Sequence, residues 1–155
     1  HLSPDALQQI ATAADDIIKR LEKAPNRGVE WVPETPTTKN PFVRDYQSSA
    51  PGARSNIATQ KPEVPALRYY NPNPNGRNKV RFDGMEDNIL IDRKWSVTSK
   101  SKQLDDLKRM SEALRQNPGY CGRIEVPTQA IANRTQRILD SQGIKNIEVK
   151  VGPPQ

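Results

Sequence analysis

The stretch VRFDGMEDNILIDRKWSV, residues 80–97, most strongly constrains what this chain can fold into. Apolar and polar residues alternate over residues 79–83 and again over residues 88–97, a period that is typical of β-strands. The GMEDN segment between them predicts a tight turn, and therefore a hairpin. The strands nevertheless carry Asp83, Asp92 and Lys94, residue types that strand interiors disfavour. These charges need an explanation.

Strand geometry brings the three charges together. Because successive side chains point to opposite faces, Asp92 and Lys94 project from the same side of the second strand. Asp83 ends the first strand, and a hairpin places its carboxylate near that of Asp92. Two close carboxylates repel each other, and burial increases the penalty. A divalent cation would relieve it, and we expect Mg²⁺, or another such ion (Mn²⁺ or Zn²⁺), held by Asp83 and Asp92.

This arrangement predicts hydrolysis of a phosphate ester. Water held by the cation would serve as the nucleophile, while Lys94 would position it, deprotonate it or stabilise the charge that builds on the phosphate. The alternative is a surface hairpin in which Asp83, Asp92 and Lys94 form a structural ion-pair cluster. On the other face of the strand, Trp95 is predicted to be a core residue. Glu86 and Asp87 are predicted to be solvated turn residues.

The second half of the chain predicts an α/β fold. A helix with an apolar face follows the hairpin and stops at Asn117-Pro118-Gly119, a short strand CGRIEVP comes next, Thr128 begins another helix, and IKNIEVKV forms the last strand. Strands that alternate with helices predict a central mixed sheet flanked by helices. We assign residues 42–155 to this domain.

The first half predicts much less regular structure. Ser3, Pro4 and Asp5 are typical of a helix start, and an apolar stripe then predicts a helix within residues 1–24. Residues 25–41 are interpreted as a Pro-rich linker. Residues 25–78 as a whole are expected to be largely loop, with a short helix over about 42–49 and a helical turn over about 53–59.

Composition narrows the function classes. A formal net charge of +6 favours a polyanionic partner such as nucleic acid. The single cysteine, Cys121, rules out an intrachain disulfide and a cysteine-based zinc site. No apolar run approaches the ~20 residues that span a bilayer, so we expect no stable membrane association. No nucleotide-binding glycine motif is present, and the one histidine is terminal.

Five cations are candidates to bind phosphates, or else belong to a solvated helix face: Arg93, Lys100, Lys102, Lys108 and Arg109. Tyr69 and Tyr70 are expected to anchor a loop rather than to stack on bases.

The spacing of Asp83 and the Asp92-x-Lys94 pair resembles the PD-(D/E)xK signature of restriction-endonuclease-like nucleases. The motifs RDYQ, VRFDG, ILIDRKWSV, KQLDDLKRMSEALRQ, GRIEVP and GIKNIEVKV, spread over residues 42–152, resemble in their order the restriction-endonuclease-fold toxin domains of bacterial polymorphic toxins, including contact-dependent inhibition and Rhs proteins. The resemblance implies that Asp83, Asp92 and Lys94 are catalytic. It also adds Gln103 to the catalytic set, near the site at the start of the following helix; the alternative for Gln103 is a solvated residue of the first helical turn. Many such nucleases also use an acidic residue from the first core helix. The resemblance does not identify that residue here, because Asp45 and Glu63 are the available candidates.

The same resemblance implies a biological role. It predicts a nuclease toxin used in interbacterial competition, secreted or delivered from a bacterial surface into the cytoplasm of a target bacterium, and restrained by a cognate immunity protein. DNA is the favoured substrate, and RNA or tRNA is the alternative. A different class of function, a non-enzymatic module that binds nucleic acid or protein, stays open at this point.

Overall fold

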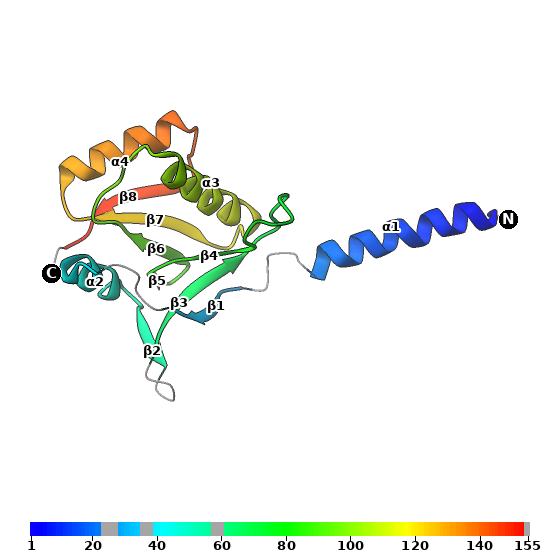
Figure 1. The fold of residues 1–155 in the computed structure, drawn as a ribbon, viewed down its shortest axis with the longest axis horizontal. Helices are drawn as coiled ribbons and strands as arrows, with labels where there is room; N and C mark the ends of the chain where they lie inside the picture. The colour runs from blue at the N-terminus through cyan, green and yellow to red at the C-terminus, as the bar shows by residue number, and fades with distance from the viewer. Residues whose placement is uncertain (23–27, 35–38, 57–60, 154–155) are drawn as a thin grey trace.

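The computed structural model describes residues 1–22, 28–34, 39–56 and 61–153, which form a mixed α/β fold with two β-sheets (Figure 1). The helices are α1 (Pro4–Glu22), α2 (Pro41–Ser48), α3 (Ser101–Gln116) and α4 (Gln129–Ser141). The strands are β1 (Glu30–Pro33), β2 (Arg54–Asn56), β3 (Lys61–Arg68), β4 (Lys79–Arg81), β5 (Gly84–Glu86), β6 (Ile89–Arg93), β7 (Cys121–Val126) and β8 (Ile147–Val151). The predicted fold class, a mixed α/β protein, is confirmed.

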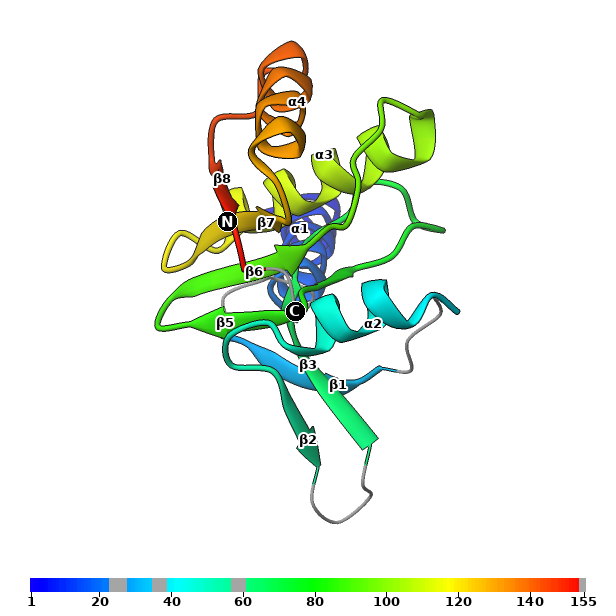
Figure 2. The same ribbon diagram turned by 90° about the vertical axis from the view of Figure 1, so that its left-hand side faces the viewer.

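The mixed sheet has the strand order β5-β6-β7-β8. β5 pairs with β6 in antiparallel fashion, whereas β6, β7 and β8 run parallel, and α3 and α4 form the crossovers between them. Leu90, Ile124 and Ile147 point from this sheet into one hydrophobic core, which also contains Leu107 of α3 and Leu139 of α4. Both crossover helices therefore cover one face of the sheet, and α2 covers the other (Figure 2).

A second, antiparallel sheet lies in the region that was expected to be mainly loop. Its order is β1-β3-β2, and β4 pairs with the far end of β3. The loop prediction is wrong for residues 30–33 and 61–68, and the predicted helical turn is wrong for residues 54–56, which form β2; residues 57–59 lie outside the described residues. Prolines suppressed the strand signal, because proline cannot donate to a β-ladder. It can still accept: Pro62 and Pro65 receive hydrogen bonds from Glu34 N–H and Phe82 N–H.

Asp83 lies where the chain passes from one sheet to the other. β4 belongs to the antiparallel sheet, Phe82 and Asp83 follow, and β5 belongs to the mixed sheet. The predicted hairpin therefore exists, but it joins β5 to β6 rather than residues 79–83 to 88–97. Where β5 begins, the backbone requires a glycine, since a Cβ on Gly84 would lie 2.1 Å from the carbonyl oxygen of Pro51.

Helix α1 extends away from the two sheets (Figure 1). Its predicted start is confirmed, because Ser3 Oγ accepts a hydrogen bond from the Ala6 N–H. The apolar side chains of Leu7, Ile10 and Ile17 are more than half exposed. In the described part of the chain, no helix combines the length and the apolar character that a bilayer span would need.

Candidate active site

Strand β6 presents Asp92 and Lys94 on the face that carries Leu90, as the alternation predicted. Lys94 Nζ lies 3.0 Å from Asp92 Oδ2, and their side chains are 25% and 16% exposed. The negative charge of Asp92 raises the pKa of Lys94, which outweighs the opposing effect of burial. The lysine is therefore an ammonium ion at neutral pH, held at the edge of the hydrophobic core.

Two backbone-directed hydrogen bonds fix Asp83 against β6. Its N–H donates to the carbonyl oxygen of Ile91 (2.8 Å), and its Oδ2 accepts from the N–H of Arg93 (2.7 Å). Its carboxyl group thereby lies beside that of Asp92. Burial raises the pKa of Asp83 well above its ordinary value, and the neighbouring charge of Asp92 raises it further. The predicted convergence of Asp83, Asp92 and Lys94 is therefore present in the structure.

The charge of a third carboxylate, Glu34, acts on this pair. Glu34 follows β1 and is half-buried, and its charge contributes to the raised pKa of Asp83. Burial also raises the pKa of Glu34, Arg81 lowers it, and Asp92 raises it. Asp45 and Glu63 were the upstream acids expected from the sequence; Glu34 was not predicted, because it lies in the segment 25–41 that was interpreted as a linker. Asp45 is exposed on α2, and Glu63 lies on β3 opposite Pro33 and Arg54.

Gln103 lies in the first turn of α3 and organises the chain just after β6. Its Oε1 accepts a hydrogen bond from the Thr98 N–H at 2.7 Å. The contact gives Gln103 a role in holding the β6–α3 connection. One turn further along α3, the charge of Asp106 also acts on Lys94. The start of α3 therefore flanks the carboxylates, although Gln103 itself is engaged with backbone.

The carboxylates of the site provide part of the ligand set that a hard divalent cation needs. Carboxylate oxygens suit Mg²⁺, which is commonly held by one or two carboxylates together with water and substrate phosphate. Asp83 and Asp92 provide two such groups, and their mutual repulsion is the penalty that a cation would remove. Over the described residues, no three acidic, histidine or cysteine side chains are close enough to form a complete metal cage. The geometry therefore suits an ion completed by other ligands.

The opposite face of β6 carries a buried network instead of cations available to phosphates. Arg93 is 3% exposed, and its guanidinium donates to Glu125 Oε1 (2.9 Å), Ser49 Oγ (2.8 Å) and the carbonyl of Tyr46 (3.1 Å). The prediction that Arg93 grips phosphates is therefore wrong, because α2 covers this face. Trp95 was expected in the core, but it is 36% exposed and meets the ring of Tyr46 edge-on.

The other cations predicted to grip phosphates divide into two groups. Lys100, Lys102 and Lys108 are exposed. Arg109 is engaged, since it donates to Tyr69 Oη at 3.0 Å and to the carbonyl oxygen of Lys79 at 3.0 Å. Tyr69 is buried and anchors the following loop, as predicted, by accepting from Asn71 Nδ2.

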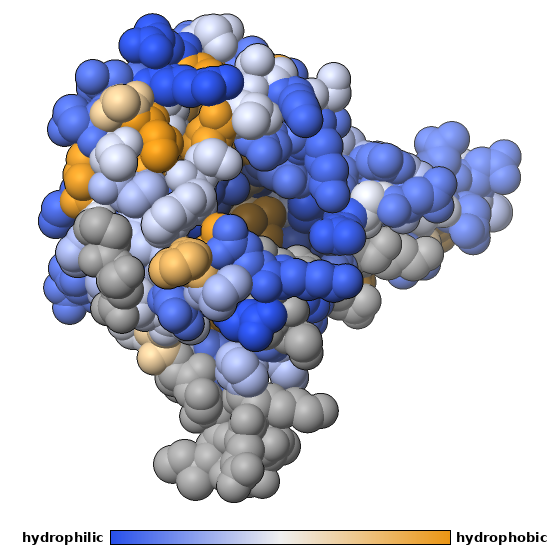
Figure 3. Space-filling view, turned by 60° about the vertical axis from the view of Figure 1, so that its left-hand side comes forward, coloured by the Kyte–Doolittle hydropathy of each residue, from blue (hydrophilic) through white to orange (hydrophobic). Residues whose placement is uncertain are grey.

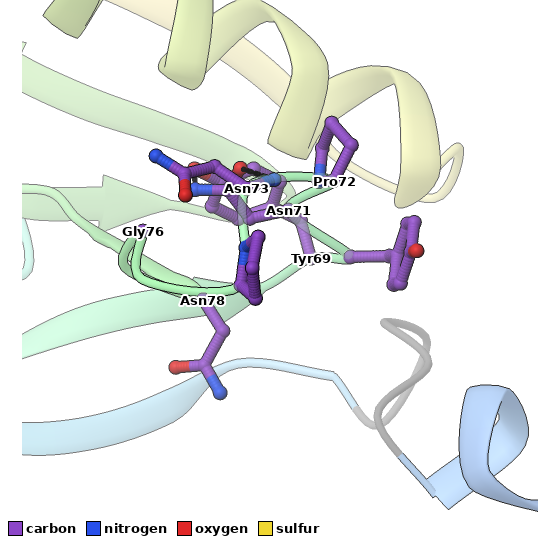
Figure 4. Close-up of a pocket in the computed structure, with 8 residues that line it drawn as sticks. Tyr69, Asn71, Pro72, Asn73, Gly76 and Asn78 are labelled. Carbon is purple, nitrogen blue, oxygen red and sulfur yellow. Dashed lines mark hydrogen bonds between the residues drawn. The ribbon is translucent and has the colours of Figure 1, made fainter.

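That loop encloses a small pocket of about 180 Å³, lined by residues between Tyr69 and Asn78 (Figure 4). None of the predicted site residues lines it. Elsewhere, Figure 3 shows a hollow in one face of the molecule that is bordered mainly by hydrophilic side chains.

Substituting Tyr46 by Phe is expected to leave the protein as stable as the wild type or stabilise it by up to about 1 kcal/mol. Among the described residues, the buried Tyr46 hydroxyl has no hydrogen-bond partner, and burial raises its pKa to about 12. Removing the hydroxyl therefore removes an uncompensated polar group. Urea unfolding of Tyr46→Phe measures this, and Tyr46→Ala, which should lose about 3–5 kcal/mol, is the matched control for packing. A clear loss in the Phe variant would reveal a missing partner.

No family model, curated protein or solved structure matches this chain.

Proposed function

We propose that this chain is a metal-dependent nuclease that hydrolyses phosphodiester bonds, with Asp83 and Asp92 as the ligands of a divalent cation, most simply Mg²⁺. The observation that carries the proposal is the convergence of two half-buried carboxylates with a lysine at 3.0 Å from one of them. Folding buries Asp83 beside another carboxylate at an energetic cost: burial raises the pKa of Asp83, and the neighbouring charge of Asp92 raises it further. Such costs concentrate at functional sites.

Each residue has a distinct role in this proposal. A divalent ion at Asp83 and Asp92 would supply Lewis-acid stabilisation of phosphoryl charge. Lys94, held by Asp92, contributes a fixed positive charge where a phosphate oxygen becomes more negative. Glu34 adds a carboxylate that can accept a hydrogen bond from water beside the pair. Gln103 acts as a positioning residue through its hydrogen bond to Thr98.

The biological setting follows from the motif resemblance alone. We place the nuclease among bacterial toxins that are delivered into a target cell, with DNA favoured over RNA or tRNA as the substrate. A cognate immunity protein of acidic character would then restrain it in the producing cell, since the chain carries a formal net charge of +6.

A second candidate function is a non-enzymatic module that binds nucleic acid or protein. The direct Lys94–Asp92 ion pair favours it, because the pair already satisfies part of the charge without a metal. In that case the three residues stabilise the fold and do no chemistry.

Cleavage assays with the variants Asp92→Asn and Lys94→Met separate the two candidates. We expect the wild type to degrade plasmid DNA, or total RNA, in Mg²⁺ but not in EDTA. Each variant should lose activity by about 10²- to 10³-fold, because each removes charge at the reacting phosphate. Asp140→Asn and Lys145→Met, at exposed positions of α4 and the loop after it, are the matched controls and should remain active. Wild-type binding without metal-dependent cleavage would favour the module.

A further inference from the structure

The acidic residues of the site would repel a polyanionic substrate, and the other residues of the site do not fully offset this repulsion. Glu34, Asp83 and Asp92 make the centre acidic, yet a nucleic acid brings a phosphate charge at about every 3.4 Å of each strand. Lys94 is a single cation beside these three carboxylates, so it offsets only part of their negative charge. A substrate strand therefore needs cations along its approach to Asp83.

Strand β4 leads directly to Asp83 and carries cations on one face. Val80 and Phe82 are 8% and 1% exposed and point into the core. The residues that alternate with them, Lys79 and Arg81, therefore point outward, and Arg77 lies exposed in the loop just before β4. Cations two residues apart on a strand are separated by about 6.6 Å. That spacing corresponds to about two nucleotide rises along one strand of nucleic acid.

The middle of this row is held in place by neighbouring strands. Lys79 lies opposite Arg68 of β3 in the β-ladder, and both form ion pairs with Glu30 of β1. Two cations against one carboxylate leave this group positive. The row thus continues across β3 and β4 as a rigid surface.

The two ends of the row are the accessible cations. Arg77 and Arg81 are exposed, and neither forms a salt bridge with another residue in the described ranges. The backbone at Arg77 is fixed, because Asn71 Nδ2 donates to its carbonyl oxygen at 2.9 Å. Arg81 is close enough to Glu34 for its charge to act on that carboxylate. It therefore stands at the rim of the acidic centre.

We propose that Arg77 and Arg81, with the Arg68–Lys79 pair between them, bind the phosphate backbone of a polynucleotide strand and lead it along β4 to Asp83. This inference rests on the proposed nuclease function and names the surface that presents its substrate. Lys79 and Arg81, at the two ends of β4, are separated by about 6.6 Å, and Arg77 and Asp83 lie just beyond these ends. The surface recognises phosphate, not base sequence.

Binding measured in EDTA tests the surface independently of cleavage. Fluorescence anisotropy of a labelled single-stranded 20-mer is followed at several salt concentrations for the wild type and for Arg77→Gln, Arg81→Gln and the double variant. We expect the double variant to bind about 10- to 100-fold more weakly at low salt. The negative slope of the logarithm of the binding constant against the logarithm of salt concentration should become shallower by about 0.7–0.9 for each arginine removed. Arg134→Gln and Arg137→Gln, exposed on α4, are the matched controls and should bind as the wild type does.

The outcomes separate the two proposals. Weaker binding in the β4 variants alone supports the surface, whether or not the wild type cleaves. Cleavage by the wild type with β4 variants that bind like the controls overturns the surface and leaves the nuclease intact. A wild type that neither binds nor cleaves overturns both. Circular dichroism of each variant confirms that the exposed substitutions have not altered the fold.

Discussion

Replacing Asp83 by Asn should make the protein more stable at neutral pH and inactive as a nuclease. The pKa of Asp83 is raised by burial and by the charge of Asp92, so its ionised form is disfavoured in the folded state. Asparagine keeps an oxygen that can accept from the Arg93 N–H, and it removes the repulsion. We expect a gain of about 0.5–2 kcal/mol in the free energy of unfolding. Cleavage should fall by about 10²- to 10³-fold.

The pH dependence of stability follows from the sign of the same shift. Between the unfolded pKa of an aspartate and the higher pKa of Asp83 in the fold, the folded state holds more protons than the unfolded state. The free energy of unfolding therefore falls as pH rises through this window, and the contribution is fully lost above the folded pKa. The raised pKa of Glu34 has the same sign.

Urea unfolding at several pH values between about 4 and 8 measures both effects. The wild-type profile should decline towards neutral pH more steeply than that of Asp83→Asn. Asp105→Asn, at an exposed position of α3, is the control for loss of one negative charge and should follow the wild type. An Asp83→Asn variant that is less stable than wild type at pH 7 would mean that the carboxylate stabilises the fold.

Local periodicity was sufficient to predict the helices and strands whose apolar pattern lies within one short segment of the sequence. The apolar alternation around Asp92 and the helical spacing of Leu107, Met110 and Leu114 specify β6 and α3, and with them one face of the site. The antiparallel sheet escaped prediction, because β3 contains two prolines that serve as acceptors. Its pairing with β1 joins residues that are 30 to 36 positions apart in the chain, from Pro33 with Glu63 to Glu30 with Ala66.

The same limit explains which site residues were found. Asp83, Asp92 and Lys94 lie within one stretch of 12 residues, so their meeting could be predicted from strand geometry. Glu34 is 49 residues before Asp83, and only the tertiary fold brings it to them. Alternation also placed Arg93 correctly on the opposite face of β6, but it could not reveal that α2 covers that face.

Replacing Arg93 by Ala should destabilise the protein by about 3–5 kcal/mol, because it breaks a buried ion pair. The substitution leaves Glu125, which is 4% exposed, with a buried charge whose main partner is gone. It also removes the donor to Ser49 Oγ and one of two donors to the Tyr46 carbonyl oxygen, which keeps its hydrogen bond from the Ser49 hydroxyl. Arg123, whose Nη1 lies 3.7 Å from Glu125 Oε2, can compensate only in part.

A double variant tests whether the loss comes from the uncompensated charge. Arg93→Met combined with Glu125→Leu fills the same space without charges, and such exchanges are often neutral or stabilising. We expect it to recover much of the stability lost in Arg93→Ala, as measured by guanidinium unfolding followed through Trp fluorescence. Arg134→Ala, exposed on α4, should change stability by less than about 0.5 kcal/mol. If Arg93→Ala loses less than about 1 kcal/mol, the network is not what holds α2 on the sheet.

The Arg93 network also bears on the acidic site, because the two share one strand. Arg93 donates its backbone N–H to Asp83 on one side of β6 and its guanidinium to Glu125 on the other. Asp92 precedes Arg93 in the chain and Lys94 follows it. The contacts that anchor Arg93 therefore also hold these two residues in place. Arg93→Ala should then reduce cleavage more than its loss of folded protein explains, and the double variant should recover part of that activity. Equal specific activity per folded molecule in Arg93→Ala would show that the two faces of β6 are energetically independent.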